Sequence, residues 1–145
     1  MKELEYPFDS SFLLQKRRKL KKALLADGSA RMEKRIAVLG GSTTSDIVSM
    51  LELFLLNCGI QPVFYQSEYA QYWQDAMFDA PELAAFQPDL IFIHTTSRNI
   101  TEAPLPLSAS EQEVQDALER QYTHFTQMWE HLAATYPVSY THLTL

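Results

Sequence analysis

A glycine turn rich in hydroxyl side chains holds the residue types best suited to chemistry. A short apolar run at residues 36–39 leads into the turn 40–45, GGSTTS, and Asp46 then opens a helical pattern. Glycines let a backbone approach a ligand closely, hydroxyls can cap a helix or face a substrate, and free N–H groups at a helix start favour an anion. This pattern predicts a site at the carboxyl end of a strand.

A second polar loop follows the strand expected at residues 90–94 and holds Arg98 and Asn99. If three parallel strands lie in the order 2-1-3, this loop and the glycine turn share one edge of the sheet. The candidate ligand-binding residues are therefore Gly40, Gly41, Ser42, Thr43, Arg98 and Asn99. Such amides, hydroxyls and a guanidinium could hold a phosphate or carboxylate. Alternatively, the hydroxyls only cap the helix and Arg98 pairs with a nearby acid.

An alternation of strands and helices has to position these two loops. Strands are expected at residues 35–39, 62–66 and 90–94, and helices at 45–58, 69–77 (a short helix or loop), 81–86 and after the capping box Ser110-x-x-Glu113. An earlier helix should begin at a Ser10 or Ser11 cap and end at Asp27-Gly28. This order is typical of an α/β fold, a three-layer α/β/α arrangement with a parallel sheet and right-handed crossovers.

Helical spacing predicts which side of two helices is buried. For the helix at 45–58 the expected face comprises Ile47, Met50, Leu51, Phe54, Leu55 and Cys58. For the last helix it comprises Val114, Ala117, Leu118, Phe125, Met128, Trp129 and Leu132. Both sets recur at intervals of three and four residues, so we expect each to pack against the sheet.

Composition limits the classes to which this protein can belong. The chain has 145 residues, of which 46% are hydrophobic and 12% aromatic, which indicates one folded domain. The single cysteine, Cys58, excludes an internal disulfide framework and favours a reducing compartment. The charged amino terminus does not resemble a secretion signal, and no apolar run is long enough to span a bilayer. A cytoplasmic protein without a membrane partner is expected.

Positive charge is concentrated near the amino terminus. Residues 1–35 carry a net charge of +5, and residues 36–145 carry −11. Half of the twelve basic residues lie in one short segment: Lys16, Arg17, Arg18, Lys19, Lys21 and Lys22. Such a cluster could attract an acidic partner, although a solvated helix face explains the same residues. Nucleic acid is not expected as a partner, because the acidic remainder has no second basic patch.

Five blocks of the sequence, in order, resemble the amino-terminal region of FkbH-like proteins of the HAD superfamily, subfamily IIIC. They are KELEYPFD at residues 2–9, AVLGGSTTSD at 37–46, MLELFLL at 50–56, QYWQD at 71–75 and PDLIFIH at 88–94. The resemblance implies a basic helical segment at residues 1–34 and an SGNH-hydrolase-like, flavodoxin-like domain at 35–137, truncated. Characterised members act in polyketide and related pathways, where they dephosphorylate a phosphoglycerate unit and load the glyceryl group on an acyl carrier protein.

The family's HAD domain, with its DxDxT-type loop and magnesium site, has no counterpart in this sequence. The DxxxD pattern Asp75–Asp79 lies in a helical context and is not expected to replace it. The resemblance therefore implies a ligand-binding or docking domain without a cofactor or metal of its own, with an acyl carrier protein as the partner of the basic segment. Residues 138–145, VSYTHLTL, resemble a translated adapter sequence, so we expect a non-native tail and a natural chain that continues beyond residue 137.

The resemblance also implies a nucleophile-like role for Ser42, since SGNH hydrolases place their serine after the first strand. Their G-x-N-D block would fall where this chain has Thr96 and Arg98, with Asn99 one position further on, and their Asp-x-x-His block is absent. His94 is expected to be structural, and the other histidines are His124, His131 and His142. No histidine is thus expected to activate Ser42. An SGNH-type serine esterase and a pure protein-docking module stay open as alternatives.

Overall fold

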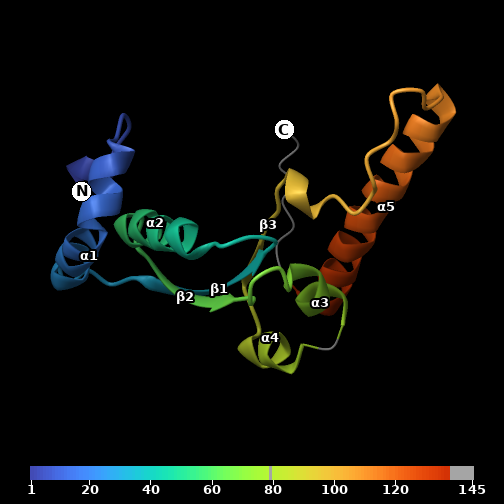
Figure 1. The fold of residues 1–145 in the computed structure, drawn as a ribbon. Helices are drawn as coiled ribbons and strands as arrows, with labels where there is room; N and C mark the ends of the chain where they lie inside the picture. The colour runs from blue at the N-terminus through green and yellow to red at the C-terminus, as the bar shows by residue number, and fades with distance from the viewer. Residues whose placement is uncertain (79, 138–145) are drawn as a thin grey trace.

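Three parallel strands form the central sheet of the computed structural model, which describes residues 1–78 and 80–137 (Figure 1). They are β1 (Met32–Gly40), β2 (Ile60–Gln66) and β3 (Leu90–His94), in the order β2-β1-β3. The predicted strand order is therefore confirmed. β1 begins three residues before the expected strand, because its charged and exposed first part pairs with the start of β2 rather than with the core. The tail predicted at residues 138–145 lies outside the described residues, as does Asp79.

The apolar residues of β1 alternate between the two faces of the sheet. Ile36 and Val38 pack with Val48 of α2 (Ser45–Asn57) on one face. Ala37 and Leu39 join the main core on the other face. That face is covered by α3 (Tyr72–Met77), α4 (Pro81–Phe86) and α5 (Glu111–Thr135). Both faces of the central strand are thus covered by helices, which confirms the predicted three-layer α/β/α fold.

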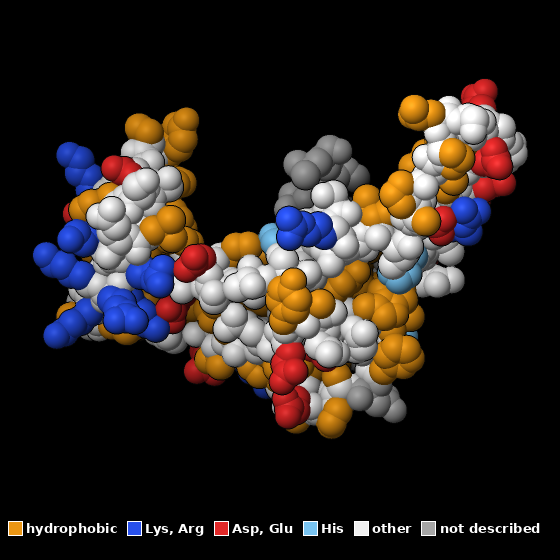
Figure 2. All heavy atoms as spheres, in the orientation of Figure 1, with side chains coloured by type: hydrophobic (Ala, Val, Ile, Leu, Met, Phe, Trp, Pro, Cys, Tyr) orange, Lys and Arg blue, Asp and Glu red, His pale blue; other side chains and the backbone are white. Residues whose placement is uncertain are grey.

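Helix α1 (Ser10–Ala26) packs on the outer side of α2, and Lys and Arg side chains gather around it (Figures 1 and 2). Leu20 and Leu24 of α1 share a core cluster with Leu53 and Leu56 of α2. Helix α2 is therefore covered by the sheet on one side and by α1 on the other. The predicted single apolar face of α2 is wrong for this reason. Its buried residues are Val48, Leu53 and Leu56, and Cys58 is exposed at the end of the helix.

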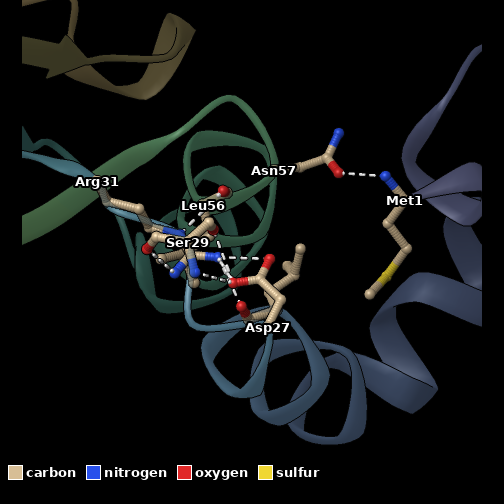
Figure 3. A network of polar contacts seen from close by, with 7 residues as sticks. Met1, Asp27, Ser29, Arg31, Leu56 and Asn57 are labelled. Atoms are coloured by element: carbon tan, nitrogen blue, oxygen red, sulfur yellow. Dashed lines mark hydrogen bonds and ion pairs between the residues drawn. The ribbon is translucent and has the colours of Figure 1, made fainter.

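Side chains at both ends fix α1 in place. At its start Asp9 is the cap, with Oδ1 accepting from the Phe12 N–H at 3.0 Å, so the predicted cap at Ser10 or Ser11 is wrong by one residue. Near its end, Arg31 forms an ion pair with Asp27 at 2.9 Å, and the Arg31 side chain is only 7% exposed. The same guanidinium group donates to the Leu24 carbonyl and, at 3.3 Å, to the Leu56 carbonyl (Figure 3). One guanidinium thus binds the carboxyl ends of α1 and α2, where the helix dipole favours a cation.

The same corner contains further polar contacts. Ser29 donates to Asp27 from both its hydroxyl, at 2.7 Å, and its backbone N–H, at 2.9 Å, and these bonds with the Arg31 pair lower the pKa of Asp27 to about 2. The amino group of Met1 donates to Asn57 Oδ1, which brings the short helix η1 (Lys2–Leu4) against α2 (Figure 3). The amino-terminal segment is therefore attached to α2 at several points.

Only part of the apolar side of α5 is covered. Ala117, Met128 and Leu132 are buried, whereas Val114 and Leu118 are 42% and 61% exposed. The predicted apolar face is therefore confirmed for the carboxyl half of the helix and wrong at these two positions near its start. Here the helix extends past the sheet and faces the loop that precedes it (Figure 1). In the part of the chain that the structure describes, no helix is both long and apolar enough to cross a membrane.

We expect His124 of α5 to make the protein less stable in acid. Its ring stacks on Trp73 of α3, with centroids 3.6 Å apart, and its buried Nε2 has no hydrogen-bond partner among residues 1–78 and 80–137. Burial lowers the pKa of His124 from its usual value of 6.5. The unfolded chain therefore takes up a proton that the folded protein resists, and the free energy of unfolding should fall as the pH drops through about 6.5.

Urea unfolding at about pH 7.5 and about pH 5.5 measures this dependence, since the two values bracket the ordinary histidine pKa. His124→Phe keeps the stacking on Trp73 and removes the titrating group, so it should lose a substantial part of the pH dependence. His131→Phe, the same substitution at an exposed histidine of α5, should keep the pH dependence of the wild type. Equal dependence in the wild type and His124→Phe would contradict this role for His124.

Candidate functional site

The glycine turn after β1 is held from both sides by the ends of the neighbouring strands. The Gly41 N–H donates to the His94 carbonyl of β3 at 2.8 Å. The Gly40 N–H donates to Ser67 Oγ, just after β2, at 2.8 Å, and the Ser67 N–H donates to the Val38 carbonyl at 3.0 Å. The predicted meeting of the loops after β1 and β3 at one sheet edge is therefore confirmed. Ser67 is a supporting residue that sequence reasoning missed.

Asn99 packs directly against the glycine turn. It closes the short helix η2 (Ser97–Asn99), where its Oδ1 accepts from the Thr96 N–H at 2.8 Å. Its Nδ2 then donates to the Gly41 carbonyl at 3.0 Å. A Cβ at Gly41 would lie 2.4 Å from that nitrogen, so the close approach requires glycine at this position. The structure thus brings Asn99, Gly40 and Gly41 together, as the sequence predicts.

Ser42 lies beside His94, which the sequence interpretation placed in a structural role. The hydroxyl Oγ is 3.3 Å from His94 Nδ1, and both side chains are half-buried. The expectation that no histidine is positioned to activate Ser42 is therefore wrong, because His94 lies within hydrogen-bond distance of the hydroxyl. The parallel register sets Gly40 opposite His94, and the turn that follows carries Ser42 over the end of β3. A histidine at the end of the strand next to β1 is the signal that could have revealed this contact.

The other predicted ligand-binding side chains are open to solvent. Thr43 is exposed, and the Arg98 guanidinium, also exposed, makes no ion pair or hydrogen bond among the described residues. The alternative in which Arg98 pairs with a nearby acid is therefore wrong within residues 1–78 and 80–137. Thr44 occupies the cap position of α2, and its side chain makes no hydrogen bond to the helix. The alternative in which the hydroxyls of the turn only cap the helix is therefore not supported at this position.

The arrangement around Ser42 contains the parts of a nucleophilic site. With its proton on Nε2, His94 can accept the Ser42 proton at Nδ1, and such contacts often shorten when a substrate binds. Asn99 Nδ2 has a second hydrogen beyond the one donated to Gly41. Among residues 1–78 and 80–137 the backbone N–H groups of Ser42 and Thr43 have no hydrogen-bond acceptor. These three donors could stabilise a developing oxyanion or bind an anionic ligand.

The side chains that most often bind metal ions are not clustered in the described residues. Within residues 1–78 and 80–137, no three His, Cys, Asp or Glu side chains are grouped closely enough to hold one. Asp75, the first residue of the DxxxD pattern, instead accepts a hydrogen bond from the Tyr65 hydroxyl at 2.9 Å. Burial and this carboxylate raise the Tyr65 pKa well above its usual value.

The basic segment of α1 is divided between internal contacts and solvent. Arg17 pairs with Asp46 at 3.0 Å, and Lys21 pairs with Glu52 at 2.8 Å, so both residues contact α2. The other four predicted partner-binding residues are exposed: Lys16, Arg18, Lys19 and Lys22. Exposed ion pairs of this kind contribute little to stability. The four free side chains therefore form the part of the segment that can meet a partner (Figure 2).

Gly41→Ala should destabilise the protein by about 1–3 kcal/mol, the usual range for an added group in a well-packed position. The new methyl would overlap the Asn99 amide and push η2 away from the turn. Urea unfolding measures the change. In an Asn99→Ala background, which removes the overlapping atoms, the same substitution should be much less destabilising. Equal effects of Gly41→Ala in the two backgrounds would show that Asn99 does not limit the space at Gly41.

Comparison with known proteins gives a relation at the level of the fold. No protein-family model and no curated protein matches this chain. Among solved structures, it is similar to the N-terminal part of the protein BF1531 from Bacteroides fragilis, described as containing a phosphatase domain complexed with Mg. The TM-score is 0.57 at 19% sequence identity, over 77% of this chain and 29% of the solved chain. This chain therefore corresponds to less than a third of that structure, with which it shares an α/β fold.

Proposed function

We propose that this chain is the amino-terminal SGNH-like domain of a FkbH-like protein and that Ser42 and His94 catalyse acyl transfer from an ester or thioester. The observation that carries the catalytic part is the 3.3 Å contact between Ser42 Oγ and His94 Nδ1 at the sheet edge. The five ordered sequence blocks and the likeness to part of a chain containing a phosphatase domain support the larger parent. In the intact protein, magnesium would belong to the phosphatase domain.

The proposed reaction has two halves. In the first, Ser42 Oγ bonds to the acyl carbon while its proton passes to His94 Nδ1. His94 then returns this proton to the leaving alcohol or thiol as the bond to the acyl carbon breaks. In the second, water adds to the acyl carbon with His94 as the base, the carboxylic acid leaves, and Ser42 regains its proton. Asn99 and the N–H groups of Ser42 and Thr43 are the candidate donors to the oxyanion.

A fluorophosphonate probe tests the nucleophile directly, because an activated serine displaces its fluoride and becomes phosphonylated, whereas ordinary hydroxyls do not react. We expect labelling at Ser42, located by mass spectrometry of the intact chain, and none in Ser42→Ala. Ser49 is a suitable internal control, since its hydroxyl donates to the Ser45 carbonyl at 2.8 Å and should stay unlabelled. A folded protein that shows no labelling at Ser42 under conditions that label a known serine esterase would refute the proposal.

A non-catalytic anion site at the same edge is the second candidate. The observation in its favour is that the Arg98 guanidinium and the N–H groups of Ser42 and Thr43 are all without partners among the described residues. In Ser42→Ala, calorimetric titration with inorganic phosphate or 3-phosphoglycerate should then show binding that Arg98→Gln weakens. Binding of either anion with no labelling of Ser42 would favour this candidate over acyl transfer, and the absence of both would refute the two together.

An acyl carrier protein is the partner we propose for α1. Carrier proteins are generally acidic, and opposite charges chiefly raise the association rate in a manner that salt weakens. Charge reversal to Glu at Lys16, Arg18, Lys19 and Lys22 should slow association of the full-length protein with its carrier at low salt. This set leaves the Arg17 and Lys21 pairs with α2 intact. Equal association rates for the variant and wild type at low and moderate salt would show that α1 is only surface.

A further inference from the structure

The apolar groove beside η2 is placed to receive one end of a substrate bound at Ser42. It lies between the segment that follows η2 and the first turns of α5, and its volume is about 580 Å³. Its apolar lining includes Ile100, Leu105, Val114 and Leu118. Each of these side chains is at least 41% exposed, so together they form an uncovered apolar surface. We propose that this groove holds the acyl chain of the substrate, an inference that rests on the proposed function.

The groove includes one residue of η2, the short helix whose Asn99 contacts the glycine turn. Ser97 and Ile100 line the groove, and in the sequence they flank Arg98 and Asn99. Asn99 in turn donates to the Gly41 carbonyl, one residue before the Ser42 nucleophile. This neighbourhood is the reason for placing the apolar part of an ester in the groove and its reacting carbonyl beside Asn99, the side chain that could bind the carbonyl oxygen.

The polar groups of the groove favour an uncharged occupant. Glu102 lines the groove and forms a bidentate pair with Arg120, with distances of 2.8 Å and 3.0 Å, so the Glu102 carboxylate already has a partner. Gln121 Oε1 accepts the Thr101 N–H at 2.8 Å, which leaves the buried Nε2 as a donor without a partner in the described chain. One spare donor among apolar walls suits a chain with few polar atoms.

The size of the groove also indicates a small molecule. A volume of about 580 Å³ is within the usual range for small-molecule sites, roughly 300–1,000 Å³. With the chemistry proposed at Ser42 and the apolar lining of the groove, this size indicates an ester or thioester of an apolar carboxylic acid as the substrate class. Each methylene buried in the groove contributes at most about 0.8 kcal/mol, which corresponds to about a four-fold change in binding.

Two measurements test the groove separately from the chemistry. Fluorescence titration with cis-parinaric acid, a long-chain fatty acid, on Ser42→Ala reports chain binding without turnover. Leu118→Glu should weaken this binding at least ten-fold, whereas Tyr122→Glu, one turn further along α5, exposed and outside the groove, should not. In the wild type, the rate constant kcat/KM for p-nitrophenyl octanoate should exceed that for the acetate at least ten-fold, and Leu118→Glu should remove this preference.

The outcomes separate the two proposals. Equal parinaric acid binding by Leu118→Glu and Tyr122→Glu, or no binding at all, would overturn the groove inference even if Ser42 is labelled by the fluorophosphonate. Specific loss of binding in Leu118→Glu without any labelling of Ser42 would support the groove and refute the acyl-transfer function. A dimer of the wild type that Leu118→Glu alone dissociates, seen by size-exclusion chromatography with light scattering, would show that a second copy covers the groove and would overturn the inference.

Discussion

Replacing His94 with alanine should slow fluorophosphonate labelling of Ser42 by about 10²- to 10⁴-fold, the usual contribution of a general base. The imidazole is 3.3 Å from the hydroxyl, and no other histidine has a described contact with Ser42. Without it, the serine must lose its proton to water. The rate of labelling, followed by intact-mass spectrometry under pseudo-first-order conditions, gives the ratio directly.

The appropriate control for His94→Ala is His131→Ala, because His131 is an exposed histidine on α5 away from the sheet edge. It should label at the wild-type rate. Free imidazole at high concentration should restore part of the rate of His94→Ala, since the substitution leaves space beside Ser42, and it should not accelerate Ser42→Ala. Labelling of His94→Ala at the wild-type rate would show that the contact between the two side chains has no catalytic role.

Met128→Ala should lower the free energy of unfolding by about 2–5 kcal/mol, the typical effect of truncating a large buried side chain. Met128 is fully buried in the core cluster that α5 forms with α3, α4 and β1. The substitution removes the buried side-chain atoms and leaves a cavity that the neighbouring helices can only partly fill. Urea unfolding, monitored by circular dichroism, measures the difference.

Leu118→Ala provides the matched comparison on the same helix. Leu118 is 61% exposed, so its truncation should change stability by less than about 0.5 kcal/mol, as surface substitutions usually do. Similar losses at the two positions would mean that the start of α5 is also packed against other parts of the protein. The pair therefore tests whether only the carboxyl half of α5 is anchored to the sheet.

The strands were predictable because their local sequence matches their environment. The run at residues 90–93 is apolar and His94 follows it, and β3 has the expected bounds Leu90–His94. The order β2-β1-β3 is a common one in doubly wound α/β folds, although local sequence alone does not determine it. The faces of α2 were not predictable in the same way, because periodicity shows how apolar residues are spaced but not how many neighbours cover the helix. Packing between α1 and the sheet buries α2 on two sides, and so its single expected face is wrong.

The candidate site was predictable in its location and only partly in its chemistry. Gly40, Gly41 and Asn99 could be assigned because glycine turns and strand ends have local signatures. The pairing of Ser42 with His94 depends on the register between two strands that are separated by more than forty residues. It also depends on the path of the turn after Gly41. Neither can be obtained from the spacing of residues in the sequence.

The outer edge of β3 affects how readily this chain aggregates in solution. In the described chain β3 pairs with β1 alone, so the backbone on its other side has no strand partner, and its sequence LIFIH contains neither a proline nor an acidic or basic gatekeeper other than the terminal His94. An apolar strand whose backbone is unpaired along one edge is a template for pairing with other molecules. At high concentration this chain should therefore aggregate through intermolecular β-sheet. Leu90 is 44% exposed, and Leu90→Lys should improve the solubility of the chain.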